Sequence, residues 1–251
     1  MATQTVTAYP VVHDVPALNG YLSRVFGAVE KVRMIGGAGG YHTEVQIGDT
    51  LLMVGGGGPD VAWKGDSRPM AFHVYVPDVD AAYQRALDGG GESLQAPANQ
   101  EWGERTANIK DPAGNNWYIA TFQGENYYSE GAPTVQPFLQ PFRAAPVIDF
   151  LTSAFGAIEL GRATRPDGVI LHTTLKIGNS ALELIDAFGI YHPMPGMFYL
   201  YVEDVDAVYT RALECGAEAL AGPADQPYGD CTGSVKDVSG NDWYIAAPIR
   251  K

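Results

Sequence analysis

The chain repeats itself, and this internal repeat limits its fold more than any other feature of the sequence. The segment AFHVYVPDVDAAYQRALDGGGESL, which starts at Ala71, aligns without a gap with MFYLYVEDVDAVYTRALECGAEAL, which starts at Met197. The same register continues through DPAGNNWYIA and DVSGNDWYIA, so that Trp117 aligns with Trp243. Upstream, HTEVQIGDTLLM aligns with HTTLKIGNSALE after small insertions. The sequence therefore predicts two tandem copies of one domain.

The boundary between the copies is expected in the segment QGENYYSEGAP, which is polar, contains glycine and has no apolar period. We place the first domain at residues 1–124, a linker at 125–134 and the second domain at 135–251. Apolar residues make up 46% of the chain and charged residues 18%, which is enough to bury a core in each domain.

Within one copy, local signals predict alternating strands and helices. TAYPVV is expected as one short strand, and apolar residues at helical spacing predict a helix from Val15 that ends at the FGA segment. The dipeptide Gly48-Asp49 predicts a hairpin, and Asp78 is a candidate N-cap for a second helix. Two further strands flank the DPAGN turn. The fold class is thus α+β, with the order βαβ(β)β occurring twice in each copy.

The order strand, DVD, amphipathic helix and GG, followed by a DPxGN-W-x-I strand, resembles the glyoxalase/bleomycin resistance/dioxygenase superfamily, also called the vicinal oxygen chelate (VOC) superfamily. The resemblance covers nearly the whole chain, twice. It implies four βαβββ modules whose curled mixed sheets enclose clefts, with the helices outside. The superfamily includes glyoxalases, epimerases, extradiol dioxygenases, thiol transferases and antibiotic-sequestering proteins, so that the fold does not specify the function.

The same resemblance implies metal ligands at four strand positions per copy, usually His, Glu, His and Glu. Carried onto this sequence, these positions hold Thr7, Met53, Ala71, Tyr118, Gln136, Glu183, Met197 and Tyr244. One carboxylate among eight positions does not provide the two or three ligands that divalent-metal chemistry needs. We therefore expect a tandem member that lacks the usual metal ligands and has no metal and no cofactor. If this alignment is shifted by two residues, His73 takes the ligand position that Ala71 otherwise occupies.

Strand alternation predicts which side chains face the clefts. Phe72 and Val74 should pack under a helix, which leaves His73 and Tyr75 on the opposite face. The hairpin turn places Glu44 opposite Met53. The same reasoning gives a set of ligand-binding candidates: Tyr9, Glu44, Met53, His73, Tyr75, Trp102, Tyr199, Tyr201 and Tyr228. Trp102 is expected to form part of the wall, although a loop indole can also anchor its own loop.

Five residues are candidates for catalysis: His42, His172, Glu183, Tyr118 and Tyr244. An imidazole titrates near neutral pH and can act as a general base, as can a carboxylate in an apolar cleft. A phenol can stack on an aromatic ligand or donate to an oxyanion. For each residue a purely structural role remains open: a hydrogen-bonded histidine, an ion-paired glutamate or a wall tyrosine.

Two glycine clusters, GGAGG from Gly36 and GGGG from Gly55, are not phosphate-binding loops, because neither has the G-x-G-x-x-G spacing or a following Lys-Ser/Thr. They are expected to be flexible loops at the mouth of the cleft.

Charge limits the class of partner. The formal net charge of −13 disfavours nucleic acid and anionic membranes and would suit a cationic small molecule. The chain has two cysteines, no signal-peptide pattern and no long apolar run, so a cytoplasmic location is expected. A monomer or a homodimer is possible, since tandem duplication supplies in one chain what single-copy relatives make by dimerisation.

Three functions remain open. The first is a metal-independent binding protein, of the antibiotic-sequestering or carrier type, for a small cationic or aromatic molecule. The second is a metal-free isomerase, lyase or cyclase that transfers protons through His, Glu or Tyr. The third is a metal-dependent lyase or dioxygenase with a shifted site, for which His73, His42 and Glu44 are the candidate ligands. How the four modules pair also remains open: first with second and third with fourth, or first with fourth and second with third.

Overall fold

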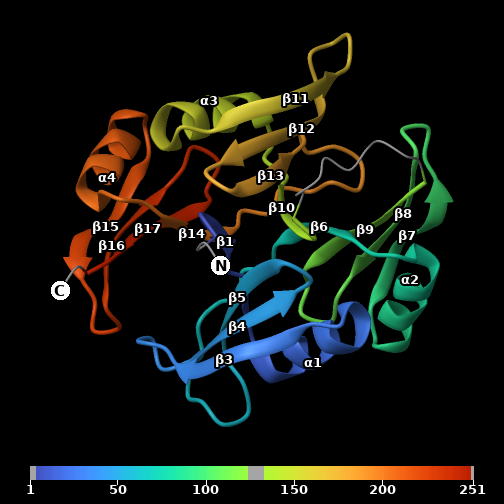
Figure 1. Cartoon of the computed structure of the whole chain (residues 1–251), viewed down its shortest axis with the longest axis horizontal. Coiled ribbons are helices and arrows are strands. Elements are labelled where there is room, and N and C mark those ends of the chain that lie inside the picture. The colour runs from blue at the N-terminus through green and yellow to red at the C-terminus, as the bar shows by residue number, and fades with distance from the viewer. Residues whose placement is uncertain (1–3, 124–132, 250–251) are drawn as a thin grey trace. The chain divides into compact units, whose positions relative to one another are not determined.

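The computed structural model of the chain describes residues 4–123 and 133–249 (Figure 1). Most of the expected linker, residues 125–132, lies outside the described residues. The chain forms two compact units. We call Tyr9–Pro137 the first-repeat unit, and Met1–Ala8 together with Phe138–Lys251 the second-repeat unit.

The first-repeat unit contains two modules, each with a helix against one face of a mixed sheet. The first module has the sheet order β2-β5-β4-β3 and comprises β2 (Val11–Val12), α1 (Val15–Phe26), β3 (Val29–Ile35), β4 (Tyr41–Ile47) and β5 (Thr50–Gly56). The second has the order β6-β9-β8-β7 and comprises β6 (Ala71–Tyr75), α2 (Val79–Asp88), β7 (Glu92–Asn99), β8 (Glu104–Lys110) and β9 (Asn116–Phe122). Helices α1 and α2 contact each other, so the two modules share one core.

The second-repeat unit has the same plan. Its strands β11 (Ile158–Thr164), β12 (Ile170–Ile177) and β13 (Ser180–Leu184) accompany α3 (Ala144–Phe155). Its strands β14 (Met197–Tyr201), β15 (Glu218–Asp225), β16 (Asp230–Lys236) and β17 (Asp242–Pro248) accompany α4 (Val205–Glu214). Helices α3 and α4 contact each other. The predicted α+β class, with four modules of mixed strands, is confirmed.

The two repeats exchange their first strands. The prediction of one strand at TAYPVV is wrong: β1 (Val6–Ala8) and β2 are separate, because Pro10 between them has no N–H with which to continue a ladder. Strand β1 pairs with β14 in the second-repeat unit, while Val135–Pro137 of β10 (Val135–Leu139) pair with β6 in the first-repeat unit.

Each exchanged strand is held by a hairpin turn of the unit that receives it. Asp49 Oδ1 accepts from the backbone N–H of Thr134 at 2.7 Å. In the second-repeat unit, Asn179 Oδ1 accepts from the N–H of Thr5 at 2.7 Å. The predicted Gly48-Asp49 hairpin is confirmed, and it has this additional role as an anchor.

The predicted helix ends are confirmed. Asp78 Oδ1 accepts from the N–H of Ala81 at 3.0 Å, which caps α2. Gly27 ends α1 in the left-handed region at φ 69°, which favours glycine. Helix α3 differs, because Arg143 occupies its N-cap position without a side-chain hydrogen bond. Instead, Asp186 from a distant loop accepts from the first helical N–H, that of Ala144.

Both repeats agree most closely at a buried aromatic stack and the turn that holds it. Trp117 stacks on Phe72 with ring centroids 4.6 Å apart, and Trp243 stacks on Phe198 at the same distance. The indole N–H of Trp117 donates to the buried carboxylate of Asp111 at 2.9 Å. Burial raises the pKa of Asp111, although its hydrogen bonds act in the opposite direction. The shared DPxGN-W pattern thus forms the turn and positions the buried tryptophan in the core.

The second glycine cluster corrects the expectation of a flexible loop, whereas residues 36–39 of the first form the turn between β3 and β4. Gly55 and Gly56 are buried residues of β5. Gly40 and Gly57 are also buried, and a Cβ on either would lie 3.0–3.1 Å from the side chain of Trp63. Backbone oxygens lie closer still, that of Gly56 to Gly40 and that of His13 to Gly57, so these glycines allow a close approach of backbone as well as of the indole.

Within the described residues, no helix is both long and apolar enough to cross a membrane.

Candidate functional site

The predicted site residues lie on the sheet faces opposite the helices. Phe72 and Val74 are fully buried against the helix side, whereas His73 and Tyr75 are half-buried on the other face, as strand alternation requires. Each unit presents two such faces, one from each module. We describe the four faces in chain order.

The first face carries a tyrosine–histidine pair. The Tyr9 hydroxyl lies 2.8 Å from Nδ1 of His42, and the two rings meet edge to face at 5.4 Å. A Cβ at residue 55 would lie 2.6 Å from the ring of Tyr9, so Gly55 is needed for this approach. Burial lowers the pKa of His42, and the nearby charge of Glu44 offsets this only in part. The pair is therefore a neutral imidazole held by a phenol.

The predicted pairing of Glu44 with Met53 across the hairpin is confirmed by the strand register. Met53 is only 5% exposed, however, so it packs in the sheet and offers a ligand little surface.

The second face has a polar row that crosses four strands. The register places Gln136, His73, Tyr118 and Asn108 side by side, on β10, β6, β9 and β8. Tyr118 therefore lies beside His73, while Ala71 lies beside Asn116. Asn108 Nδ2 donates to Gln95 Oε1 at 3.0 Å, which extends the row to β7.

At the end of this row, Gln136 is 5% exposed, and its side-chain oxygen has no hydrogen-bond partner among the described residues. A buried acceptor without a donor costs about 1–3 kcal/mol. A ligand N–H or O–H group placed here would satisfy it.

A carboxylate that the sequence analysis missed lies further along the same face. Glu104 is 3% exposed and accepts from the Tyr75 hydroxyl at 3.0 Å and from the Trp102 indole N–H at 2.8 Å. The Trp102 ring is 57% exposed, so its N–H fixes the loop while its ring faces solvent. In the sequence, this cluster is indicated only by Tyr75 at the end of a predicted strand and by the segment WGE, which contains Trp102 and Glu104.

The third face, in the second-repeat unit, brings two catalytic candidates together. His172 Nε2 lies 3.5 Å from Glu183 Oε2, with the histidine side chain 38% exposed and that of Glu183 4% exposed. Glu183 lies directly opposite Thr174 on the neighbouring strand. A buried carboxylate beside an accessible imidazole is an arrangement that can orient the imidazole for proton transfer.

The fourth face is aromatic, and we call it the tyrosine face: Tyr199, Tyr201 and Tyr244, with Tyr228 on the adjoining loop. Tyr199 and Tyr244 stack with ring centroids 5.2 Å apart and an interplanar angle of 11°. Tyr201 lies 6.2 Å from Tyr199, and all three rings are half-buried. Tyr228 is 58% exposed, with its hydroxyl 3.4 Å from that of Thr232.

An acidic residue accompanies the tyrosine face. Asp230 on β16 shares this face with Ser234, which lies opposite Tyr244 in the register. Burial raises the pKa of Asp230 above its usual range. Asp230 aligns with Glu104 of the first repeat, and Tyr201 with Tyr75.

The residues at these faces do not fit the metal that the family resemblance implies. No three His, Cys, Asp or Glu side chains of residues 4–123 and 133–249 gather closely enough to hold an ion. Among these residues, His73 does not form such a group with His42 and Glu44. The row around His73 offers one imidazole, two amides and a phenol, which is not a typical divalent-metal donor set.

A family model for the Glyoxalase/Bleomycin resistance protein/Dioxygenase superfamily matches this chain twice, over residues 12–119 and 139–245. The chain belongs to this superfamily. The resemblance predicted from the DVD helix and the DPxGN-W turn is thus confirmed.

Curated relatives of this superfamily member come from mycobacteria. The uncharacterized protein Rv0887c of Mycobacterium tuberculosis is 34% identical over 143 residues, which is 51% of this chain and 82% of that protein. The uncharacterized protein Mb0911c of Mycobacterium bovis is 35% identical over 133 residues, or 47% of this chain and 86% of that protein.

Solved structures of the superfamily share the fold across the whole chain. Glyoxalase I from Zea mays has a TM-score of 0.72 at 17% identity, covering 96% of this chain and 91% of that one. A putative dioxygenase from Bacillus subtilis has a TM-score of 0.64 at 13% identity, covering 97% of this chain and 84% of that one. At such identities the likeness shows the fold alone.

Proposed function

We propose that this chain binds a small aromatic cation on the tyrosine face of the second-repeat unit, without a metal. The observation that carries the proposal is the stacked Tyr199–Tyr244 pair, whose half-buried rings are accompanied by Tyr201 on the same sheet face. Aromatic rings attract cations through their negative faces, and stacked tyrosines also provide a flat platform for an aromatic ring. Sequestration or carriage of such a molecule is the function this supports.

Charge supports a cation over an anion. Asp230 lies on the tyrosine face, and the whole chain carries a net charge of −13. The carboxylate of Asp230 is half-buried, and the raised pKa shows that its charged form is poorly solvated. A ligand cation beside it would replace the lost solvation.

The two repeats differ at this point. In the first repeat, the aligned carboxylate of Glu104 already accepts from Tyr75 and Trp102. In the second repeat, the aligned loop residue is Tyr228, whose hydroxyl lies near Thr232 instead. The Asp230 carboxylate is therefore better placed than that of Glu104 to interact with a ligand. On this proposal the two repeats have unequal roles.

The test is a titration with benzyltrimethylammonium, measured by isothermal titration calorimetry. Benzyl alcohol is the neutral comparison. We expect the cation to bind more tightly, and Tyr244→Leu and Asp230→Asn each to weaken its binding about three- to thirtyfold. Tyr83→Leu on the surface of α2 is the control and should leave the affinity unchanged. Equal affinity for the alcohol, or unchanged binding in both site variants, would contradict the proposal.

A second candidate function is supported by the 3.5 Å approach of His172 to Glu183. In this alternative, the third face carries out metal-free proton transfer, with His172 as the general base and Glu183 as the residue that orients it. Glu183→Gln would then lower turnover by about 10²–10⁴-fold while substrate affinity stays nearly constant. A screen that follows melting temperature supplies the substrate or ligand to test, since ligands raise it by mass action.

A further inference from the structure

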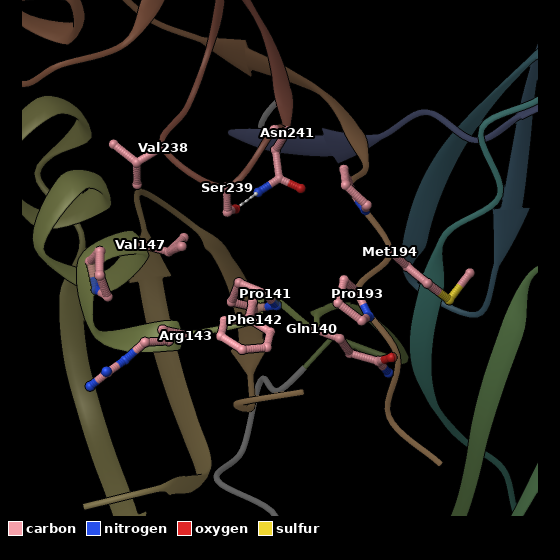
Figure 2. A pocket seen from close by; sticks show the side chains of 13 residues that line it. Gln140, Pro141, Phe142, Arg143, Val147, Pro193, Met194, Val238, Ser239 and Asn241 are labelled. Carbon is pink, nitrogen blue, oxygen red and sulfur yellow. Dashed lines mark hydrogen bonds between the residues drawn. The ribbon is translucent and has the colours of Figure 1, made fainter. Parts of the chain in front are cut away.

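A cavity in the second-repeat unit lies outside all four sheet faces. Its volume is about 460 Å³, within the range of small-molecule sites. It is bordered by the segment from Gln140 to Val147 at the start of α3, by Pro193–Pro195 before β14, and by the turn Val238–Asn241 before β17. Figure 2 shows these three segments surrounding the cavity, with Phe142 beside Pro141 and Ser239 above them.

At the equivalent place, the first repeat has a backbone bridge. Two hydrogen bonds fix the correspondence: the N–H of Gly57 donates to Val12 O as that of Ala187 donates to Pro141 O, each at 2.9 Å. In the first-repeat unit, Val11 and Arg68 then form a backbone bridge, donating to each other at 3.2 and 2.7 Å.

In the second repeat, the loop residue aligned with Arg68 is Met194, which has a proline on each side. Proline has no N–H for a ladder and restricts the residue before it. The loop beside the cavity thus carries one more proline than its first-repeat counterpart, where Pro69 also follows Arg68.

The lining specifies the chemistry of an occupant. Most of it is apolar, from four prolines together with Phe142, Met194, Val147 and Val238. Phe142 is 78% exposed, so its ring is available at the rim. Such a surface favours a flat aromatic group in van der Waals contact with proline and phenylalanine rings.

The charge around the cavity is opposite to that of the chain. Arg143 lines the cavity, and no carboxylate does, although the chain has 29 acidic and 16 basic residues. The cavity also adjoins the N-terminal end of α3, where the first helical N–H, that of Ala144, already donates to Asp186. The nearby carboxylates of Asp186 and Asp237 already accept several N–H donors each.

We infer that this cavity binds a small aromatic carboxylate, with its ring between Phe142 and the prolines and its anionic group toward Arg143. Arg143 is exposed, and Figure 2 shows its side chain running outward from the rim, so it reaches the anion by a change of rotamer. This site is separate from the tyrosine face, and its expected ligand has the opposite charge.

The test compares 1-naphthylacetate with 1-naphthylmethylamine, which carry similar rings and opposite charges. Titration of the full-length chain, followed by amide chemical shifts, should show saturable binding of the acetate with the largest changes at Val238–Gly240 and Met194. Tighter binding of the amine, no saturable binding of the acetate, or shifts centred on Tyr199 and Tyr244 would overturn the inference.

Variants separate the contributions of charge and ring. Arg143→Gln should weaken the acetate about two- to fivefold, as expected for an exposed ion pair. Arg165→Gln, which removes the same charge from a residue paired with Asp167, is the control and should have no effect. Phe142→Ala should weaken binding about three- to tenfold, while His13→Ala at the aligned first-repeat position should not. Unchanged binding in both site variants overturns the inference.

Discussion

The hydroxyl of Tyr75 donates to the buried carboxylate of Glu104 at 3.0 Å, and this bond links strand β6 to the start of β8. Trp102 donates to the other oxygen of the same carboxylate at 2.8 Å. A carboxylate that is 3% exposed needs such donors, because a buried charge without hydrogen bonds is strongly disfavoured. The Glu104 side chain therefore helps to hold the loop before β8 to the sheet, together with backbone bonds such as that from Gln123 N–H to Gly103 O.

Glu104→Gln should destabilise the chain by about 1–3 kcal/mol, because an amide accepts at only one of its two terminal atoms and leaves Tyr75 or Trp102 without its acceptor. Chemical denaturation measures the loss. The emission of the exposed Trp102 ring should change in the same variant, as its loop is released. An unchanged unfolding free energy would show that these hydrogen bonds do not hold the loop.

The aligned substitution in the second repeat should have the opposite effect. Burial raises the pKa of Asp230, so the folded state binds a proton more readily than the unfolded state. The ionised residue thus lowers stability as pH rises from its unfolded pKa through its folded pKa. Asp230→Asn removes this loss and should raise the unfolding free energy at pH 7 by less than about 1 kcal/mol, since the group is partly exposed. The gain should vanish in acid, and a variant less stable than wild type at pH 7 contradicts the assignment.

Local signals in the sequence were sufficient for the helices and turns. Asp78, Gly27 and the Gly48-Asp49 hairpin are confirmed because each acts on backbone groups within a few residues. The α+β class and the superfamily follow from the same signals, since their order in the chain is characteristic.

Contacts between distant segments could not be predicted in the same way. TAYPVV was predicted as one strand, since nothing local shows that β1 pairs with β14. Glu104 was missed because its burial depends on Tyr75, which lies on a strand beyond an intervening helix. The second glycine cluster gave a wrong expectation because its close neighbours, among them Val12, His13 and Trp63, come from other segments of the chain.

The unsatisfied amide oxygen of Gln136 gives a third prediction. Gln136→Leu should be neutral or stabilise the chain by up to about 1 kcal/mol, because it removes a buried acceptor that has no donor among the described residues. Gln95→Leu is the matched control: Gln95 Oε1 accepts from Asn108, so this variant should destabilise by about 0.5–1.5 kcal/mol. Thermal unfolding of both variants provides the comparison. A larger loss for Gln136→Leu than for Gln95→Leu would show that the Gln136 oxygen has a structural partner.

The last prediction concerns His42, whose pKa is lowered by burial and only partly restored by Glu44. The unfolded chain therefore binds a proton at this residue more readily than the folded chain. The stability that depends on neutral His42 is fully present above the ordinary histidine pKa of about 6.5 and is lost as pH falls through the lower, folded value. Imidazole NMR titration should place the His42 midpoint below the ordinary value, and His42→Gln should flatten the acid side of the stability profile. A midpoint at or above the ordinary value would mean that Glu44, rather than burial beside Tyr9, controls this histidine.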